Sequence, residues 1–132
     1  MKSQWILVAN ASLARLFRRD SPTDTLVALA TMEHPESRLK GSELADSRPG
    51  RRKAHQRFAR EIAERLDTGL AAGEFSTLGL FASSPFLGEL KEQLSNAVDK
   101  RLQLALDSDL TSFGLAEIEQ RIRNQPGLSS NS

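Results

Sequence analysis

The sequence contains no cysteine and no tyrosine, and it has a single tryptophan. Without cysteine the chain can form neither a disulfide nor a thiolate metal site, as is usual for proteins of a reducing cytoplasm. Aromatic residues make up only 5% of the chain, so few rings are available to stack on unpaired bases. We therefore do not expect sequence-specific recognition of single-stranded nucleic acid.

A long hydrophobic run is also missing. The apolar stretch near the amino terminus, residues 5–9, is shorter than the hydrophobic segment of a signal peptide. No stretch approaches the roughly 20 apolar residues that span a bilayer. The sequence therefore predicts no membrane association and a cytoplasmic location.

Neither sign of charge dominates, since 18 basic residues face 17 acidic ones and the formal net charge is +1. A chain so close to neutrality does not coat nucleic acid over its whole surface, so any anionic partner must be met locally. With 132 residues the chain is long enough for one domain with a real core. We expect a single domain over residues 1–123 and a disordered tail over 124–132.

The period of the hydrophobic pattern changes along the chain. Strands are predicted over residues 4–10, 13–19, 26–34, 76–82 and 102–106. Helices are predicted over about 54–72, 84–98 and 115–122. The second helix begins with Ser84 as its N-cap and Pro85 at its first position. Residues 102–106 could instead extend that helix.

This order, β-β-β-α-β-α-β-α, predicts an α/β fold: a mixed five-stranded sheet with helices on both faces, as in ribonuclease-H-like folds. A nuclease of that fold needs clustered carboxylates to hold two metal ions. Such a site expects one acid in the first strand and another at the end of the fourth. The strands over 4–10 and 76–82 contain none. We therefore expect no metal-dependent nuclease, no metal site and no cofactor.

Other catalytic patterns are also missing. No Gly-x-Ser-x-Gly elbow and no glycine-rich phosphate loop is present. His34 and His55 have no second ligand at metal spacing, so each is interpreted as a surface or capping histidine. Asp107 and Asp109 could lie together at a strand end, or form a turn and helix-entry pair. We therefore favour a non-enzymatic protein and name no catalytic residue.

The longest irregular stretch is residues 35–53, PESRLKGSELADSRPGRRK. Basic residues without an intervening acid gather at and after its end: Arg48, Arg51, Arg52, Lys53, Arg57 and Arg60. Arginine offers bidentate donors to phosphate, the Pro49–Gly50 pair lets the backbone turn, and the next helix adds its dipole. Residues 47–57 are therefore predicted to form an anion-binding loop. Alternatively, its arginines pair with Glu36, Glu43 and Asp46 of the same stretch.

Three segments resemble the bacterial host-attachment family, proteins required for attachment to host cells. They are WILVANASLARLF (5–17), HPESRLKGSELADSRPGR (34–51) and FLGELKEQL (86–94). The resemblance extends to about residue 123. That family is in turn similar to the middle domain of archaeal and eukaryotic peptide-release factors and of Pelota, which has a ribonuclease-H-like core.

In those release factors a basic, glycine-rich loop carrying Gly-Gly-Gln precedes a helix and enters the peptidyl-transferase centre. Residues 47–66, SRPGRRKAHQRFAREIAERL, have the same layout. Here, however, Gly50 is followed by Arg51 and Arg52, and Gln56 already belongs to the helix. The resemblance therefore implies an RNA contact without the residue that would position a hydrolytic water.

Our leading hypothesis is a cytoplasmic, non-enzymatic, translation-related domain that binds the ribosome or structured RNA. The predicted nucleic-acid-binding residues are Arg48, Gly50, Arg51, Arg52, Lys53 and Arg57, with Lys40 and Arg38 as lesser additions. An alternative is a host-attachment-related or protein-interaction factor that docks a protein partner through residues 35–53. A peptidyl-tRNA hydrolase-like activity is the third hypothesis. The oligomeric state stays open.

Overall fold

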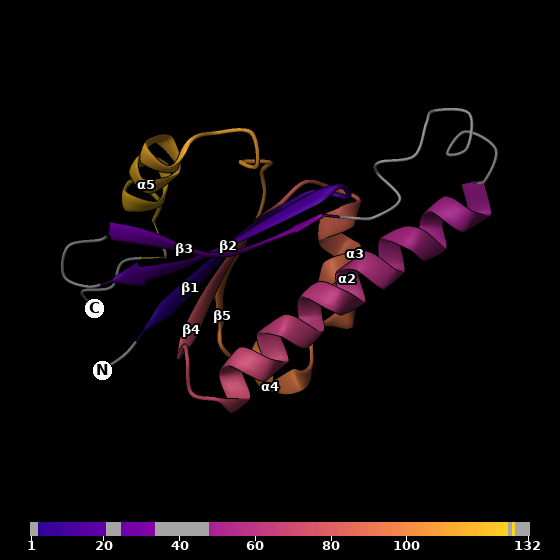
Figure 1. Ribbon diagram of the computed structural model, residues 1–132, viewed down its shortest axis with the longest axis horizontal. Coiled ribbons are helices and arrows are strands. Elements are labelled where there is room, and N and C mark those ends of the chain that lie inside the picture. The colour runs from indigo at the N-terminus through magenta and orange to yellow at the C-terminus, as the bar shows by residue number, and fades with distance from the viewer. Residues whose placement is uncertain (1–2, 21–24, 34–47, 127, 129–132) are drawn as a thin grey trace.

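The computed structural model describes residues 3–20, 25–33, 48–126 and 128, and for residues 48–53 it describes the backbone alone (Figure 1). The elements are β1 (Gln4–Ala9), β2 (Leu13–Asp20), β3 (Thr25–Glu33), α2 (Arg48–Ala71), β4 (Thr77–Ala82), α3 (Phe86–Gln93), α4 (Asn96–Asp99), β5 (Leu102–Asp107) and α5 (Leu115–Arg123). All five predicted strands are present. Residues 102–107 form a strand and do not extend the preceding helix.

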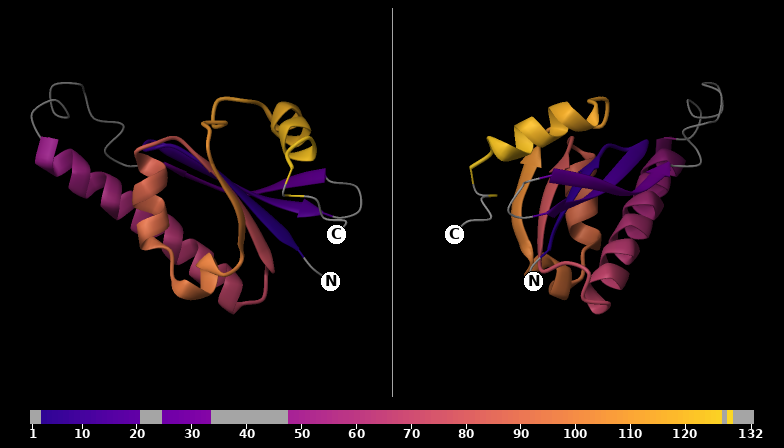
Figure 2. Two further views of the ribbon diagram at one scale, coloured as in Figure 1. Left: turned by 180° about the vertical axis from the view of Figure 1, so that it is seen from behind. Right: turned by 60° about the vertical axis from the view of Figure 1, so that its left-hand side comes forward.

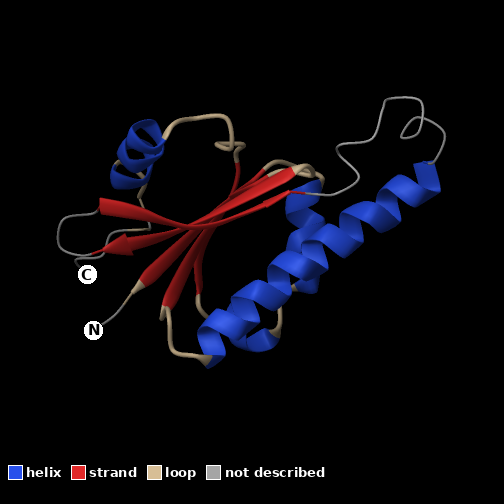
Figure 3. Cartoon of the chain, in the orientation of Figure 1, coloured by secondary structure: helices blue, strands red, loops and turns tan. Residues whose placement is uncertain are grey.

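The five strands form one sheet in the order β3-β2-β1-β4-β5 (Figure 3). The first three strands pair antiparallel, as the predicted meander requires. On its other side β1 pairs parallel with β4, and β4 pairs parallel with β5. The predicted mixed five-stranded sheet of the ribonuclease-H-like folds is thereby confirmed.

Strand β1 lies at the centre because it is apolar on both faces. All six of its residues are buried, and Leu7 is paired with Leu16 of β2 on one side and with Leu80 of β4 on the other. A strand covered by helices above and below needs such a continuous apolar run rather than alternation.

Helices α2, α3 and α4 cover one face of the sheet, and α5 covers the other (Figure 2). On the first face Leu7 and Leu80 pack in one core cluster with Phe58 and Ile62 of α2. The Phe58 ring also stacks on Phe86 of α3, with centroids 5.7 Å apart. None of the helices in the described ranges is both long and apolar enough to cross a membrane.

The other face carries a smaller core cluster. Ile6, Val8 and Phe81 of the sheet pack there with Ile118 and Ile122 of α5. Leu128 is fully buried in the same cluster, so the predicted disordered tail over 124–132 is wrong at this residue. The tail was predicted to be disordered because most of its residues are polar, but its one leucine packs in the core. Residues 129–132 lie outside the described residues.

The helix predicted over 84–98 is two helices, because the chain turns extended after α3. Leu94 has ψ of 137° and Ser95 has ψ of 162°. The Ser95 hydroxyl accepts a hydrogen bond from the Val98 amide at 3.2 Å and caps α4. A serine that satisfies the backbone in this way competes with helix continuation.

The predicted start of the second helix is also wrong. Pro85 is the N-cap of α3 and follows a cis peptide bond. Ser84 therefore caps nothing, and its hydroxyl donates to Asp107 instead, at 2.7 Å. Local sequence predicts that Ser84 caps the helix, but its side chain bonds to Asp107 at the end of β5.

Candidate nucleic-acid interface

Helix α2 begins at Arg48, about six residues before its predicted start. Prediction of a loop over residues 47–57 is therefore wrong from Arg48 onward. Pro49 is compatible with this position because the first amides of a helix have no intrahelical acceptor, so the missing N–H of proline removes nothing. Gly50 is helical too and does not provide the turn expected of it.

The predicted nucleic-acid-binding residues thus lie on one helix and not in a loop. Six of them occupy its first ten residues: Arg48, Gly50, Arg51, Arg52, Lys53 and Arg57. Arg38 and Lys40 lie outside the described residues. So do Glu36, Glu43 and Asp46, and pairing of the arginines with those carboxylates therefore stays a prediction.

The amino-terminal end of α2 projects beyond the sheet and α3, whereas its carboxyl-terminal part lies against them (Figure 1). Ala54 is the first residue of the helix with a described buried side chain, followed by Phe58 and Ile62. At 1.5 Å per residue, the six residues before Ala54 extend the helix by about 9 Å. This projecting end contains no large apolar residue.

Charge is distributed unevenly along α2. Residues 48–60 include six basic residues and no acidic one, whereas residues 61–71 include three acidic residues and one arginine. The first turn contains no acid. Because the amino terminus of a helix is the positive end of its dipole, backbone and side chains both favour an anion at the projecting end.

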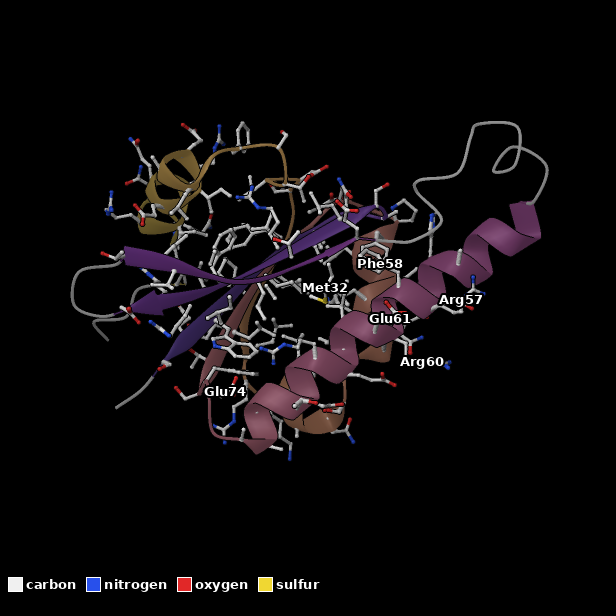
Figure 4. The ribbon with its side chains drawn as sticks, in the orientation of Figure 1. Met32, Arg57, Phe58, Arg60, Glu61 and Glu74 are labelled. Atoms are coloured by element: carbon white, nitrogen blue, oxygen red, sulfur yellow. The ribbon has the colours of Figure 1, made fainter. Side chains whose placement is uncertain are left out.

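Two of these cations have described side chains, Arg57 and Arg60, and both are exposed (Figure 4). No hydrogen bond or ion pair joins the Arg60 side chain to another residue in the described part of the chain. Arg65, further along α2, is engaged instead: its guanidinium lies 5.0 Å from the Trp5 ring centroid and 3.9 Å from Glu74. Arg60, in the first half of the helix, is therefore a cation that a ligand can reach.

Two other polar residues of α2 were singled out from the sequence. His55 is half-buried, and its ring meets the edge of Phe86 with centroids 6.3 Å apart. It therefore helps to pack α2 on α3. Gln56 lies within the helix, as the sequence predicts, and its side chain is half-buried.

The carboxyl ends of β4 and β5 are joined through Asp107. Its carboxylate accepts hydrogen bonds from the Ser84 hydroxyl at 2.7 Å and the Ser84 amide at 3.0 Å. These two bonds, the hydroxyl one first, lower the pKa of Asp107. The aspartate fixes the segment that enters α3.

Asp109 has a similar structural role beside it. Burial would raise the pKa of Asp109, but hydrogen bonds from the Asn10 side chain at 3.0 Å and from Thr111 outweigh it and lower the pKa. The contacts favour the interpretation of Asp107 and Asp109 as loop-fixing residues. Over the described ranges, no three His, Cys, Asp or Glu side chains gather as metal ligands.

The comparisons with known proteins agree with this architecture. Residues 3–122 match the model of one protein family, bacterial archaeo-eukaryotic release factor family 12. The chain belongs to this family. The release-factor part of the resemblance is thereby confirmed, whereas neither comparison supports the host-attachment part.

Among solved structures, the chain is similar to the crystal structure of the archaeal translation termination factor aRF1. The TM-score is 0.51 at 11% sequence identity, and the match covers 92% of this chain and 38% of aRF1. At this identity the likeness concerns the fold, and the chain corresponds to well under half of aRF1. No curated protein matches the chain.

Local sequence contained a sign of the true helix start that the prediction missed. Proline is frequent at the first position of a helix, and Pro49 is followed within four residues by three strong helix formers, Arg51, Arg52 and Lys53. Gly50 between them suggested a turn. The family layout of a basic loop before a helix reinforced that interpretation.

Proposed function

We propose that this chain is a non-enzymatic, translation-related domain that contacts the phosphates of ribosomal or other structured RNA through the start of α2. The observation that carries the proposal is the concentration of six cations, without an acid, on residues 48–60 of one helix, four of them on its projecting end. Membership of a release-factor family makes the ribosome the first partner to test. Such a role would place the chain in the cytoplasm.

The contact is expected to read the RNA backbone rather than its bases. Residues 48–60 span about 18 Å as a helix, at 1.5 Å per residue, which is long enough to meet several phosphates. Base stacking would need exposed aromatic rings, yet Trp5 and Phe58 are each only 1% exposed. Shape and phosphate contacts are the usual means of recognising folded RNA.

Peptidyl-tRNA hydrolysis is not part of the proposal. The motif Gly-Gly-Gln is absent from the sequence. Gln56 is the glutamine that follows the basic residues, and it is half-buried in the third turn of α2. We assign no residue to the positioning of a hydrolytic water.

Ribosome co-sedimentation at graded salt tests the proposal. The first variant replaces Arg51, Arg52 and Lys53 by alanine, which keeps helix propensity high. The control variant replaces three exposed cations elsewhere, Lys91, Lys100 and Arg101, by alanine. We expect the α2 variant to bind at least tenfold more weakly than wild type, and the control to bind within twofold of it.

Two results would contradict the proposal: no binding by the wild-type chain, or equal loss in both variants. Repeating the assay with ribosomal RNA freed of its proteins separates the alternatives. Binding to ribosomes but not to the free RNA, while still depending on the α2 cations, would favour a protein partner over RNA.

A further inference from the structure

The face of the sheet under α5 contains a slot that is filled from the carboxyl-terminal segment. Leu128 is 0% exposed there, within the cluster that includes Ile6. The slot exists because position 79 is a glycine: a Cβ on Gly79 would lie 2.9 Å from Leu128 Cδ2 and 3.0 Å from Ile6 Cδ1. Any larger residue at this place in β4 would compete with the leucine for the same space.

A buried arginine forms the polar side of the slot. Arg19 of β2 is only 5% exposed, and its Nη1 donates to the Leu128 carbonyl oxygen. The same nitrogen donates to Gln4 Oε1 at 2.8 Å. Gln4 Nε2 in turn donates to Gln103 Oε1 of β5 at 2.6 Å. A chain of side chains across the sheet thus orients the guanidinium that holds the leucine backbone.

The segment has a single apolar anchor. In residues 124–132, NQPGLSSNS, Leu128 is the one large apolar side chain. The described bonds of Asn124 and Gln125 are local: their amides continue the last turn of α5, and the Gln125 side chain donates to the Pro126 carbonyl at 3.2 Å. Among the described residues 124–126 and 128, the Leu128 side chain and the charge-assisted hydrogen bond to its carbonyl are the contacts that hold the chain against the sheet, and they must offset the conformational entropy of ordering it.

We propose that Leu128 acts as a releasable latch, and that the slot under it is a binding site for a leucine-bearing peptide segment. The slot recognises a leucine side chain over Gly79 together with a backbone carbonyl at Arg19. A partner segment with these two features would compete with the latch. This site lies on the opposite face of the sheet from α2, so it stands or fails independently of the RNA proposal.

The first test adds the occupant in trans. Full-length Leu128→Ala leaves the slot vacant, and it is titrated with the peptide NQPGLSSNS or its leucine-to-alanine control while amide shifts are followed by NMR. We expect saturable shifts at Gly79 and Arg19 with the leucine peptide alone. Wild type should respond at least tenfold more weakly, because its own latch acts at a high effective concentration. Equal responses to both peptides, or none, would overturn the binding site.

The second test does not depend on the folding of Leu128→Ala. In the full-length Gly79→Ala variant the added methyl displaces Leu128, so carboxypeptidase should trim through position 128 at least fivefold faster than in wild type. In the double variant Gly79→Ala/Leu128→Ala the added methyl occupies the space that the leucine leaves. The decrease in its melting temperature relative to wild type should therefore be smaller than the sum of the decreases in the two single variants. Trimming at the wild-type rate together with additive melting temperatures would refute the latch.

Discussion

Gly69 of α2 lies directly against the indole ring of Trp5 on β1. An added Cβ at position 69 would be 2.6 Å from Trp5 Cζ3, far closer than carbon atoms approach without displacement. The ring itself is held in place, because it stacks on Phe75 with centroids 4.5 Å apart and carries Arg65 at 5.0 Å from its centroid. This contact sets how closely α2 approaches the centre of the sheet.

We therefore expect Gly69→Ala to destabilise the protein, although alanine is the better helix former. Overpacking of a rigid core contact lowers the free energy of unfolding by about 1–3 kcal/mol, which exceeds the gain in helix propensity of about 0.5–1 kcal/mol. Gly88→Ala in α3 is the matched control, because nothing lies within 4 Å of its added Cβ. It should be stabilising or neutral in urea denaturation. A Gly69→Ala variant at least as stable as wild type would show that the Trp5 ring moves aside.

Glu119 of α5 is expected to matter more than Glu117 on the same helix. The Glu119 carboxylate accepts from the backbone amide of buried Leu26 on the edge strand β3, at 2.9 Å. Glu119→Ala leaves that amide without its acceptor, so the free energy of unfolding should fall by about 1–3 kcal/mol. Glu119→Gln keeps an acceptor oxygen and should recover most of the loss.

Glu117 provides the control for this measurement. Its carboxylate pairs with Arg121 at 2.8 Å, but both side chains are 47% exposed. Exposed pairs of this spacing contribute about 0.3–0.5 kcal/mol. In parallel urea denaturation, Glu117→Ala should therefore change stability by at most about half as much as Glu119→Ala. A larger effect of Glu117→Ala would refute the ranking.

Asp109 should make stability depend on acid pH. Its pKa in the folded chain is below the ordinary value of 3.8, so the folded state favours the ionised form. That contribution is complete above the unfolded value and is lost as pH falls through the folded one, below about 3.8. We expect Asp109→Asn to lower stability at pH 7 and to flatten its decline between pH 5 and pH 2.

Urea midpoints at pH 7, 5, 4, 3 and 2 measure this dependence. Glu92→Gln, at an exposed position of α3, is the matched loss of one carboxylate. It shows how the loss of one negative charge by itself changes the urea midpoints. Parallel profiles for all three proteins would mean that the hydrogen bonds from Asn10 and Thr111 do not favour the charged form of Asp109.

The slope of log K for RNA binding against log salt should report how many cations of the chain contact phosphate. Each phosphate contact contributes about 0.7–0.9 to the slope of log K against log salt. The double variant Arg57→Ala/Arg60→Ala should therefore reduce the slope by about 1.5, whereas Lys100→Ala/Arg101→Ala should leave it unchanged. Fluorescence anisotropy with a structured ribosomal RNA fragment gives both slopes. An unchanged slope in the first variant would exclude these two residues from the interface.

Most of the sheet was predictable because its residues leave little choice. The run that forms β1 is apolar on both faces, and β4 and β5 are bounded by turn-forming residues, so their limits fall within about two residues of prediction. The helix break at Leu94 was missed because Leu87, Leu90, Leu94 and Val98 keep a helical spacing across it. Only the cap at Ser95 distinguishes two helices from one.

The basic residues of the candidate site could be named from the sequence, but the sequence did not show that they lie on a helix. Pro49 and Gly50 are found both in turns and in the first turn of a helix, and local pattern could not decide between them. The slot for Leu128 was beyond sequence analysis altogether. It depends on Gly79, Arg19 and Leu128, which come from three separate parts of the chain.

The central position of β1 has a consequence for the nascent chain. Ile6 is paired with Phe17 on one side but with Gly79 on the other, so its second partner is made much later. At about 5–20 residues per second, synthesis of the intervening residues takes roughly 3–12 s. For that interval the β1–β2 hairpin has an unpaired apolar edge, and chaperones that bind exposed apolar segments are expected to engage it there.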